Sequence, residues 1–150
     1  MQVDSQAPAV ARVSLQMAAT PEKVWTVLTD IRQWSTWNPD VKSVSIDGPV
    51  APGTTFRWKA GPGTITSVFQ AVEPSHLVAW TGRTLGIRAI HVYRLERQGD
   101  MTLVTSEESW AGVPVQLARG SMQKTLQRAI ESGLQHLKTR VETPSVTSVP

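Results

Sequence analysis

Alternation between apolar and polar residues dominates the middle of the chain, from residue 41 to residue 110. Apolar side chains often recur there at every second position, a period typical of strands with one buried face. Turn sequences rich in Gly, Pro and Asp interrupt the pattern at 47–49, 61–63, 73–75 and 98–100. The pattern therefore predicts about six consecutive strands in an antiparallel meander.

Helical patterns flank this block of strands. Before it, residues 12–17 alternate as a further strand, and Thr20 is placed to cap a helix that has Pro21 at its first position. A second short helix is predicted over 30–37. After the block, apolar and charged residues separate onto opposite sides at helical spacing, which predicts one long amphipathic helix over about 114–141.

The size and composition fit one globular domain. The chain has 150 residues, of which 40% are hydrophobic and 18% charged. We expect the domain over residues 11–142, between a flexible N-terminal tail (1–10) and a flexible C-terminal tail (143–150). There is no cysteine, which excludes disulfides, thiol nucleophiles and thiolate metal sites.

The charge adds little to this picture. Fifteen Lys and Arg face 12 Asp and Glu, and the excess is scattered along the sequence, so no nucleic-acid partner is predicted. There is no run of about 18 apolar residues, so no stable membrane insertion is expected either. The N-terminus does not have the pattern of a secretory signal. We expect a cytoplasmic protein, either a monomer or a homodimer.

Tryptophans gather in the predicted short helices. Residues 20–39 hold three of the six, Trp25, Trp34 and Trp37. Rings of this size so close in sequence suggest a wall of a cavity or one edge of a core. We expect Trp34 and Trp37 to border a ligand space, and core packing alone is the alternative.

The chain resembles a known superfamily in the order of its elements and in a set of loose motifs. The motifs are Val24-Trp25, Leu28-Thr29-Asp30, Trp34, Trp37-Asn38-Pro39, Gly53-Thr54, Glu73-Pro74 with Leu77 to Trp80, His91 to Leu95, Thr102 to Thr105, Glu107-Glu108 and Gly112. They resemble the SRPBCC superfamily, also called START-like or helix-grip proteins, and within it the polyketide cyclase/dehydrase-like group. The resemblance covers about residues 10–142.

This resemblance implies an α+β fold of the helix-grip type. In it a seven-stranded curved antiparallel sheet wraps around a long C-terminal helix, with two short helices after the first strand. It also implies a cavity between sheet and long helix that holds an apolar or aromatic small molecule, such as a lipid or a polyketide-like compound. It implies no particular chemistry, because one fold can carry many functions.

Strand alternation and helix faces predict which side chains point into that space. The expected ligand-binding set is Trp37, Phe56, Trp58, Val78, Trp80, His91, Tyr93, Val104, Ser106, Glu108, Met122 and Leu126. Apolar and aromatic residues with a few polar ones are typical of small-molecule pockets. A solid core made of the same residues is the alternative.

Three members of this set could take part in chemistry. His91 could transfer a proton or hold a ligand oxygen, and otherwise it is a neutral core histidine bonded to a neighbour. Tyr93 could orient a carbonyl or a phenol. Glu108 would have a raised pKa in an apolar cavity, but a slip of one residue would place Glu107 there instead. These candidates stay open at this point.

Other motifs exclude some functions and suggest one moving part. The three histidines lack metal-ligand spacing, and no nucleotide-binding or GxSxG sequence is present, so no metal and no cofactor are predicted. Nothing suggests Ser-His-Asp catalysis. Gly82 and Gly86 flank a predicted loop near the cavity mouth, with Gly112 opposite, and their backbone freedom would permit gating.

Three functions remain for this sequence. The first is binding of an apolar or aromatic small molecule. The second is an aromatase/cyclase-type enzyme, in which His91, Tyr93 or Glu108 promotes proton transfer. The third is a protein-interaction module, which predicts a sizeable exposed apolar patch.

Overall fold

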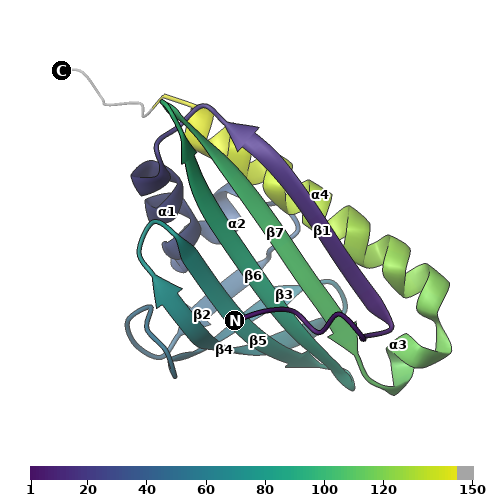
Figure 1. Ribbon diagram of the computed structural model, residues 1–150. Coiled ribbons are helices and arrows are strands. Elements are labelled where there is room, and N and C mark those ends of the chain that lie inside the picture. Colours follow the sequence, from purple (N-terminus) through teal and green to yellow (C-terminus); the bar gives the residue numbers. More distant parts are fainter. Residues whose placement is uncertain (145–150) are drawn as a thin grey trace.

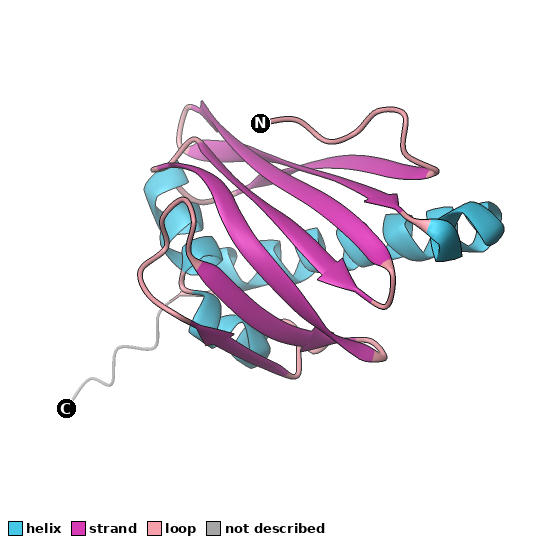
Figure 2. Cartoon of the chain, turned by 90° about the horizontal axis from the view of Figure 1, so that it is seen from below, coloured by secondary structure: helices cyan, strands magenta, loops and turns pink. Residues whose placement is uncertain are grey.

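The computed structural model describes residues 1–144 and forms one curved antiparallel sheet with helices on one face (Figures 1 and 2). The part of the predicted C-terminal tail beyond residue 144 lies outside the described residues. The elements in chain order are β1 (Ala9–Met17), α1 (Pro21–Thr29), a 3-10 turn η1 (Ile31–Gln33), α2 (Trp34–Trp37), β2 (Ser43–Ile46), β3 (Thr55–Ala60), β4 (Gly63–Glu73), β5 (Leu77–Thr84), β6 (Ile87–Gln98), β7 (Met101–Ala111), α3 (Val113–Leu117) and α4 (Arg119–Glu142).

The sheet has the strand order β1-β7-β6-β5-β4-β3-β2, and every neighbouring pair is antiparallel. Each strand from β2 to β6 therefore pairs with the next strand along the chain, and β1 pairs with β7 at one edge of the sheet. In Figure 1, α4 runs along β1 and β7, while α1 and α2 cover the other half of the same face. The predicted helix-grip fold is confirmed.

The long C-terminal helix differs from the prediction at its start. The pattern predicts one helix from about residue 114, but the structure has α3 and then α4, separated at Ala118, whose φ of −130° and ψ of 44° are not helical. Pro114 fits the first turn of α3 because its missing N–H needs no partner there. Gly120, a poor helix former, lies two residues after the break, so interrupting the helix here costs little.

Side chains of α4 form hydrogen bonds with the backbone in and next to the edge strand β1, in addition to packing against the sheet. The amide of Gln123 accepts a hydrogen bond from Val10 N (2.9 Å) and donates one to Val10 O (2.7 Å). Near the other end, Ala18 N donates to a carboxylate oxygen of Glu142 (2.8 Å). These contacts satisfy backbone groups that an edge strand otherwise leaves open to pairing. Between them, α4 buries its apolar side chains on the sheet: Leu126, Ile130, Leu134, Leu137 and Val141.

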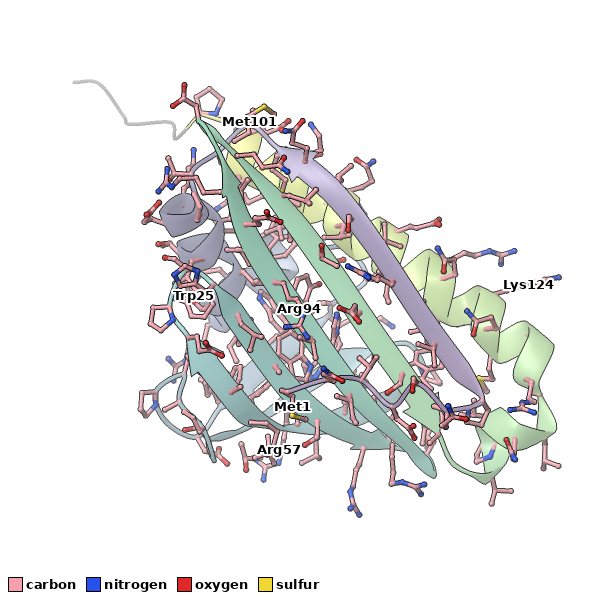
Figure 3. The ribbon with its side chains drawn as sticks, viewed as in Figure 1. Met1, Trp25, Arg57, Arg94, Met101 and Lys124 are labelled. Atoms are coloured by element: carbon pink, nitrogen blue, oxygen red, sulfur yellow. The ribbon has the colours of Figure 1, made fainter. Side chains whose placement is uncertain are left out.

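The N-terminal residues cross the opposite, convex face of the sheet (Figure 2). Val3 packs there on a small cluster of Leu77, Ala79 and Val92. The guanidinium of Arg94 donates to Met1 O (3.1 Å), and Figure 3 shows these two residues together over the middle of the sheet. The prediction of a flexible tail over residues 1–10 therefore misses these contacts, and β1 already begins at residue 9. Its short, mixed sequence gives no periodic signal.

Candidate functional site

An aromatic cluster fills the sheet's inner face beside α2. The ring centroid of Trp34 lies 5.6 Å from those of Trp58 and Trp80 and 5.9 Å from that of Phe56, mostly edge to face. Phe56 stacks on Phe69 at 4.6 Å. The Trp34 ring N–H donates to Leu28 O (2.9 Å). With only 5% of its surface exposed, Trp34 is a core residue, contrary to the expectation that it borders a ligand space.

Burial divides the predicted ligand-binding residues into two groups. Five have no exposed surface, so in this conformation they border no space large enough for a water molecule: Phe56, Val78, Val104, Ser106 and Leu126. Trp80 is almost as buried. The others keep some exposed surface: Trp37, Trp58, His91, Tyr93, Glu108 and Met122. A ligand that enters without rearranging the core would therefore contact the second group.

Two surface depressions lie at the rim of the sheet. The larger, of about 440 Å³, is lined by the β5–β6 hairpin from Arg83 to Arg88. The smaller, of about 270 Å³, lies at the β2–β3 edge and includes Trp58. Neither is lined by His91 or Glu108, so neither is the deep cavity that the family resemblance implies.

A row of polar side chains crosses the inner face from β6 to β7. The sheet register pairs Tyr93 with Ser106 and His91 with Glu108. His91 Nε2 lies 2.8 Å from Ser106 Oγ, and His91 Nδ1 lies 3.3 Å from Glu108 Oε1. The ring N–H of Trp110 donates to Glu108 Oε2 (2.8 Å). We call His91, Tyr93, Ser106, Glu108 and Trp110 the polar cluster; apolar and aromatic side chains surround it.

The structure decides between the two glutamates that the sequence leaves open. Glu108 points to the inner face with His91. Glu107 points to the convex face, where its carboxylate lies 3.3 Å from Arg94 Nε and 4.0 Å from Arg12 Nε. Sequence reasoning missed Trp110 as the partner of Glu108. Strand alternation contains the signal, because two residues along β7 a side chain returns to the same face.

Burial shifts the pKa values of the cluster. It lowers the pKa of His91 from 6.5 to about 3. It raises the pKa of Glu108 from 4.5 to about 7, and the hydrogen bond from Trp110 opposes part of that rise. Burial also raises the pKa of Tyr93, partly offset by a hydrogen bond with Ser106. Near neutral pH, the imidazole and the phenol are therefore uncharged, and Glu108 is poised to gain or lose a proton.

Glu108, His91 and Ser106 lie in a row: His91 Nε2 is hydrogen-bonded to Ser106 Oγ, and His91 Nδ1 lies 3.3 Å from Glu108 Oε1. A small movement that closed the 3.3 Å gap would let a protonated Glu108 donate to Nδ1 of His91, with Nε2–H donating to Ser106. With Glu108 ionised, Nδ1–H would instead donate to the carboxylate, and Nε2 would accept from the serine hydroxyl. The order is that of a Ser-His-acid triad, which the sequence did not suggest. Ser106 is fully buried, so no substrate carbonyl reaches it in this structure.

Trp37 lies apart from the polar cluster, on α2. It is half-buried and packs against the core. Its ring N–H is the one fully buried side-chain donor or acceptor without a hydrogen-bond partner among residues 1–144. A buried donor without a partner carries a desolvation cost.

The part of the chain that the structure describes holds neither a metal-ligand cluster nor a helix that could span a membrane. No group of three or more His, Asp or Glu side chains there is arranged to hold a metal ion. None of the described helices is long and apolar enough to cross a membrane.

Comparison with known proteins yields a family and a set of similar folds. The sequence matches the model of the family "Polyketide cyclase / dehydrase and lipid transport" over residues 8–142. No curated protein is similar enough to count as a match.

Three similar solved structures cover nearly the whole domain. The Zhui aromatase/cyclase from Streptomyces sp. R1128 has a TM-score of 0.80 at 16% identity, covering 93% of this chain and 98% of that chain. A START superfamily protein from Mycobacterium smegmatis has a TM-score of 0.72 at 17% identity, with coverages of 89% and 97%. The hypothetical protein jhp0584 from Helicobacter pylori has a TM-score of 0.82 at 16% identity, with coverages of 93% and 92%. At these identities the likeness shows the fold.

Proposed function

Because the chain belongs to the polyketide cyclase/dehydrase and lipid transport family, we propose that it binds an apolar or aromatic small molecule between the inner face of the sheet and α4. The observation that carries the proposal is the polar cluster, a few hydrogen-bonding groups set in an apolar and aromatic surface. Small-molecule sites have this composition, since apolar walls supply affinity and a few polar groups fix orientation.

The bound molecule would meet the polar cluster through a carbonyl or hydroxyl group. Tyr93 supports this, because its raised pKa keeps the hydroxyl protonated and able to donate a hydrogen bond. Across from it, α4 carries Gly133, where an added Cβ would lie 3.8 Å from the Tyr93 hydroxyl oxygen. Glycine inside a helix costs about 1 kcal/mol relative to alanine. We infer that Gly133 leaves room beside the hydroxyl for a ligand.

The first experiment is to identify any small molecule that is bound to the purified protein. Native mass spectrometry of freshly purified protein, followed by organic extraction, would detect a co-purifying aromatic or acyl molecule. That molecule, or 2-naphthol and palmitate when none is recovered, is then titrated while tryptophan fluorescence is followed. Failure of all of these to bind the folded protein would contradict the proposal.

Two pairs of variants then locate the ligand. Tyr93→Phe removes one hydroxyl and is expected to weaken binding about fivefold to tenfold, the value of one hydrogen bond. The exposed His76→Ala is its control. Gly133→Ala is expected to weaken binding while it strengthens the helix. Gly120→Ala makes the same change in α4 where an added Cβ meets nothing within 4 Å, and it should leave binding unchanged. Equal effects within either pair would remove the assignment of the site.

A second candidate function is proton-transfer catalysis of the aromatase/cyclase type. Glu108 favours it, because a carboxyl group with a pKa of about 7 can act as acid or base at neutral pH. In this reading Glu108 takes a proton from an enolisable carbon of a poly-β-carbonyl chain and returns it to the carbonyl oxygen as the chain closes into a ring. Glu108→Gln should then leave binding intact and lower the rate of ring formation about 100-fold or more, followed by absorbance of the aromatic product. Unchanged turnover would leave binding as the function.

A further inference from the structure

Three segments distant in sequence meet at one end of the molecule: the β3–β4 hairpin (59–66), the β5–β6 hairpin (82–89) and the stretch through α3 into α4 (111–124). A Cβ added at Gly63 would lie 3.3 Å from the Leu85 side chain, and one added at Gly86 would lie 3.4 Å from the Pro114 ring. Figure 1 shows α3 beside the ends of the strands here. We call this region the basic end, because all the charged residues of these three segments are Lys or Arg.

Large apolar side chains are exposed at the basic end. The exposed fractions are 65% for Leu85, 69% for Val113 and 83% for Leu117. Among the described residues, only Met1, at 45%, is a comparably exposed large apolar side chain elsewhere. Single exposed apolar residues are ordinary, but a gathering of them at one end marks an interaction surface. This is the kind of patch that a protein with a surface function would need.

Leu85 occupies a backbone conformation that disfavours it. It sits at the tip of the β5–β6 hairpin with φ of 49°, followed by Gly86 with φ of 79°. A two-residue hairpin turn with positive φ at both positions prefers Asn, Asp or Gly, because a leucine Cβ crowds the backbone there. Asn or Gly would fit this turn with less strain, and most of the leucine side chain is exposed. Such an outlier points to a role outside the fold.

The charges within the three segments are all of one sign. The three segments contain five basic residues and no acidic one: Lys59, Arg83, Arg88, Arg119 and Lys124. The rest of the chain therefore holds 10 Lys and Arg against 12 Asp and Glu. None of the five forms an ion pair within residues 1–144. Figure 3 shows Lys124 extending away from α4. The small positive net charge of the chain is thus gathered by the fold at one end.

We propose that the basic end docks on an anionic lipid bilayer. Leu85, Val113 and Leu117 would insert among the headgroups, while the basic side chains meet lipid phosphates. The apolar side chains protrude from two segments, Leu85 from the β5–β6 hairpin and Val113 and Leu117 from α3. A bilayer deforms around such protrusions, whereas a protein partner needs a matching pocket for each. The β6 strand leads from this end to His91 in four residues, so the docked end is the one nearest the polar cluster.

The test measures sedimentation of the full-length protein with vesicles, without any bound ligand, so its outcome does not depend on the proposed function. Vesicles of equimolar phosphatidylglycerol and phosphatidylcholine are compared with phosphatidylcholine alone. The protein is expected to bind the anionic vesicles at about 50 mM salt, to be released at about 500 mM, and to leave neutral vesicles unbound.

Variants separate the apolar and basic contributions. Leu85→Asn combined with Leu117→Gln is expected to lower vesicle binding about tenfold or more, and Asn adopts the strained turn more readily than Leu, so folding is preserved. Arg83→Gln combined with Arg88→Gln is expected to lower it about 25-fold, at about fivefold for each charge. The control removes two exposed arginines from outside the basic end, Arg32→Gln with Arg140→Gln, and should change binding less than about twofold.

Three results would overturn the proposal. One is equal binding to neutral and anionic vesicles, and another is equal loss in the control and in the Arg83/Arg88 variant. The third is no binding to anionic vesicles at low salt, which would leave an acidic protein as the occupant of this surface.

Discussion

Replacing Glu108 by glutamine is expected to change how the stability of the protein depends on pH. Burial raises the Glu108 pKa from 4.5 to about 7. Between these values the folded state holds a proton that the unfolded state has released, so stability from this group falls as the pH rises. Each pKa unit corresponds to about 1.4 kcal/mol, so the free energy of unfolding that Glu108 contributes falls by about 3 kcal/mol between pH 4.5 and pH 7.

His91 acts in the opposite direction. Burial lowers its pKa from 6.5 to about 3, so within this window the unfolded state binds a proton that the folded state does not, and stability rises with pH. In the wild-type protein the two slopes therefore oppose each other between pH 4.5 and pH 6.5. Glutamine mimics the protonated carboxyl, since its amide can donate to His91 Nδ1 while its oxygen accepts from Trp110. Glu108→Gln thus exposes the slope of His91 alone.

Urea unfolding followed by tryptophan fluorescence, repeated from about pH 4 to about pH 8, measures this effect. The unfolding free energy of Glu108→Gln minus that of the wild type is expected to grow by about 3 kcal/mol between pH 4.5 and pH 7. Glu107→Gln is the matched control, because it removes a carboxylate of the same strand from the convex face. A difference that stays constant over this range, or grows equally in the control, would refute the burial of Glu108 as described.

Three further changes test the packing. Gln123→Ala removes both hydrogen bonds to the backbone of Val10 and should lower the unfolding free energy, measured in urea, by about 2 kcal/mol. An unchanged unfolding free energy would mean that these two bonds do not stabilise the contact between α4 and β1. Trp80→Ala should lower it by about 3–5 kcal/mol, well above the effect of His136→Ala on α4, and thermal unfolding of both variants compares them. Val3→Asp should cost about 1 kcal/mol and increase the binding of an apolar dye to the uncovered convex face, whereas no change in either would mean that the segment carries no packing energy.

The strands could be predicted because their signal is local. Between residues 41 and 110 one face of the sheet is buried and most of the other is exposed, so apolar side chains tend to recur at every second position of the sequence. The break between α3 and α4 could not be predicted in the same way. It depends on the backbone angles of Ala118 alone, and no change in apolar period marks it.

Which candidate side chains lie on the inner face was predictable, but their contacts were not. Alternation placed His91, Tyr93 and Glu108 on the inner face, yet the pairing of His91 with Glu108 depends on the register between β6 and β7. The place of Trp34 in the core depends on how neighbouring rings interlock, which periodicity does not encode. The basic end could not be predicted from the sequence either, because its five basic residues are scattered over three segments that only the fold brings together.

The indole N–H signals of the six tryptophans test the central claim, ligand binding beside the polar cluster, most directly. Nitrogen-15 NMR spectra would follow them, assigned through single Trp→Phe variants, as the extracted molecule or palmitate is added. The account predicts shifts at Trp110, which is bonded to Glu108, and at Trp80, whose ring lies 4.8 Å from that of His91, with Trp25 on α1 unmoved. Shifts at Trp25 while Trp80 and Trp110 stay in place would contradict it.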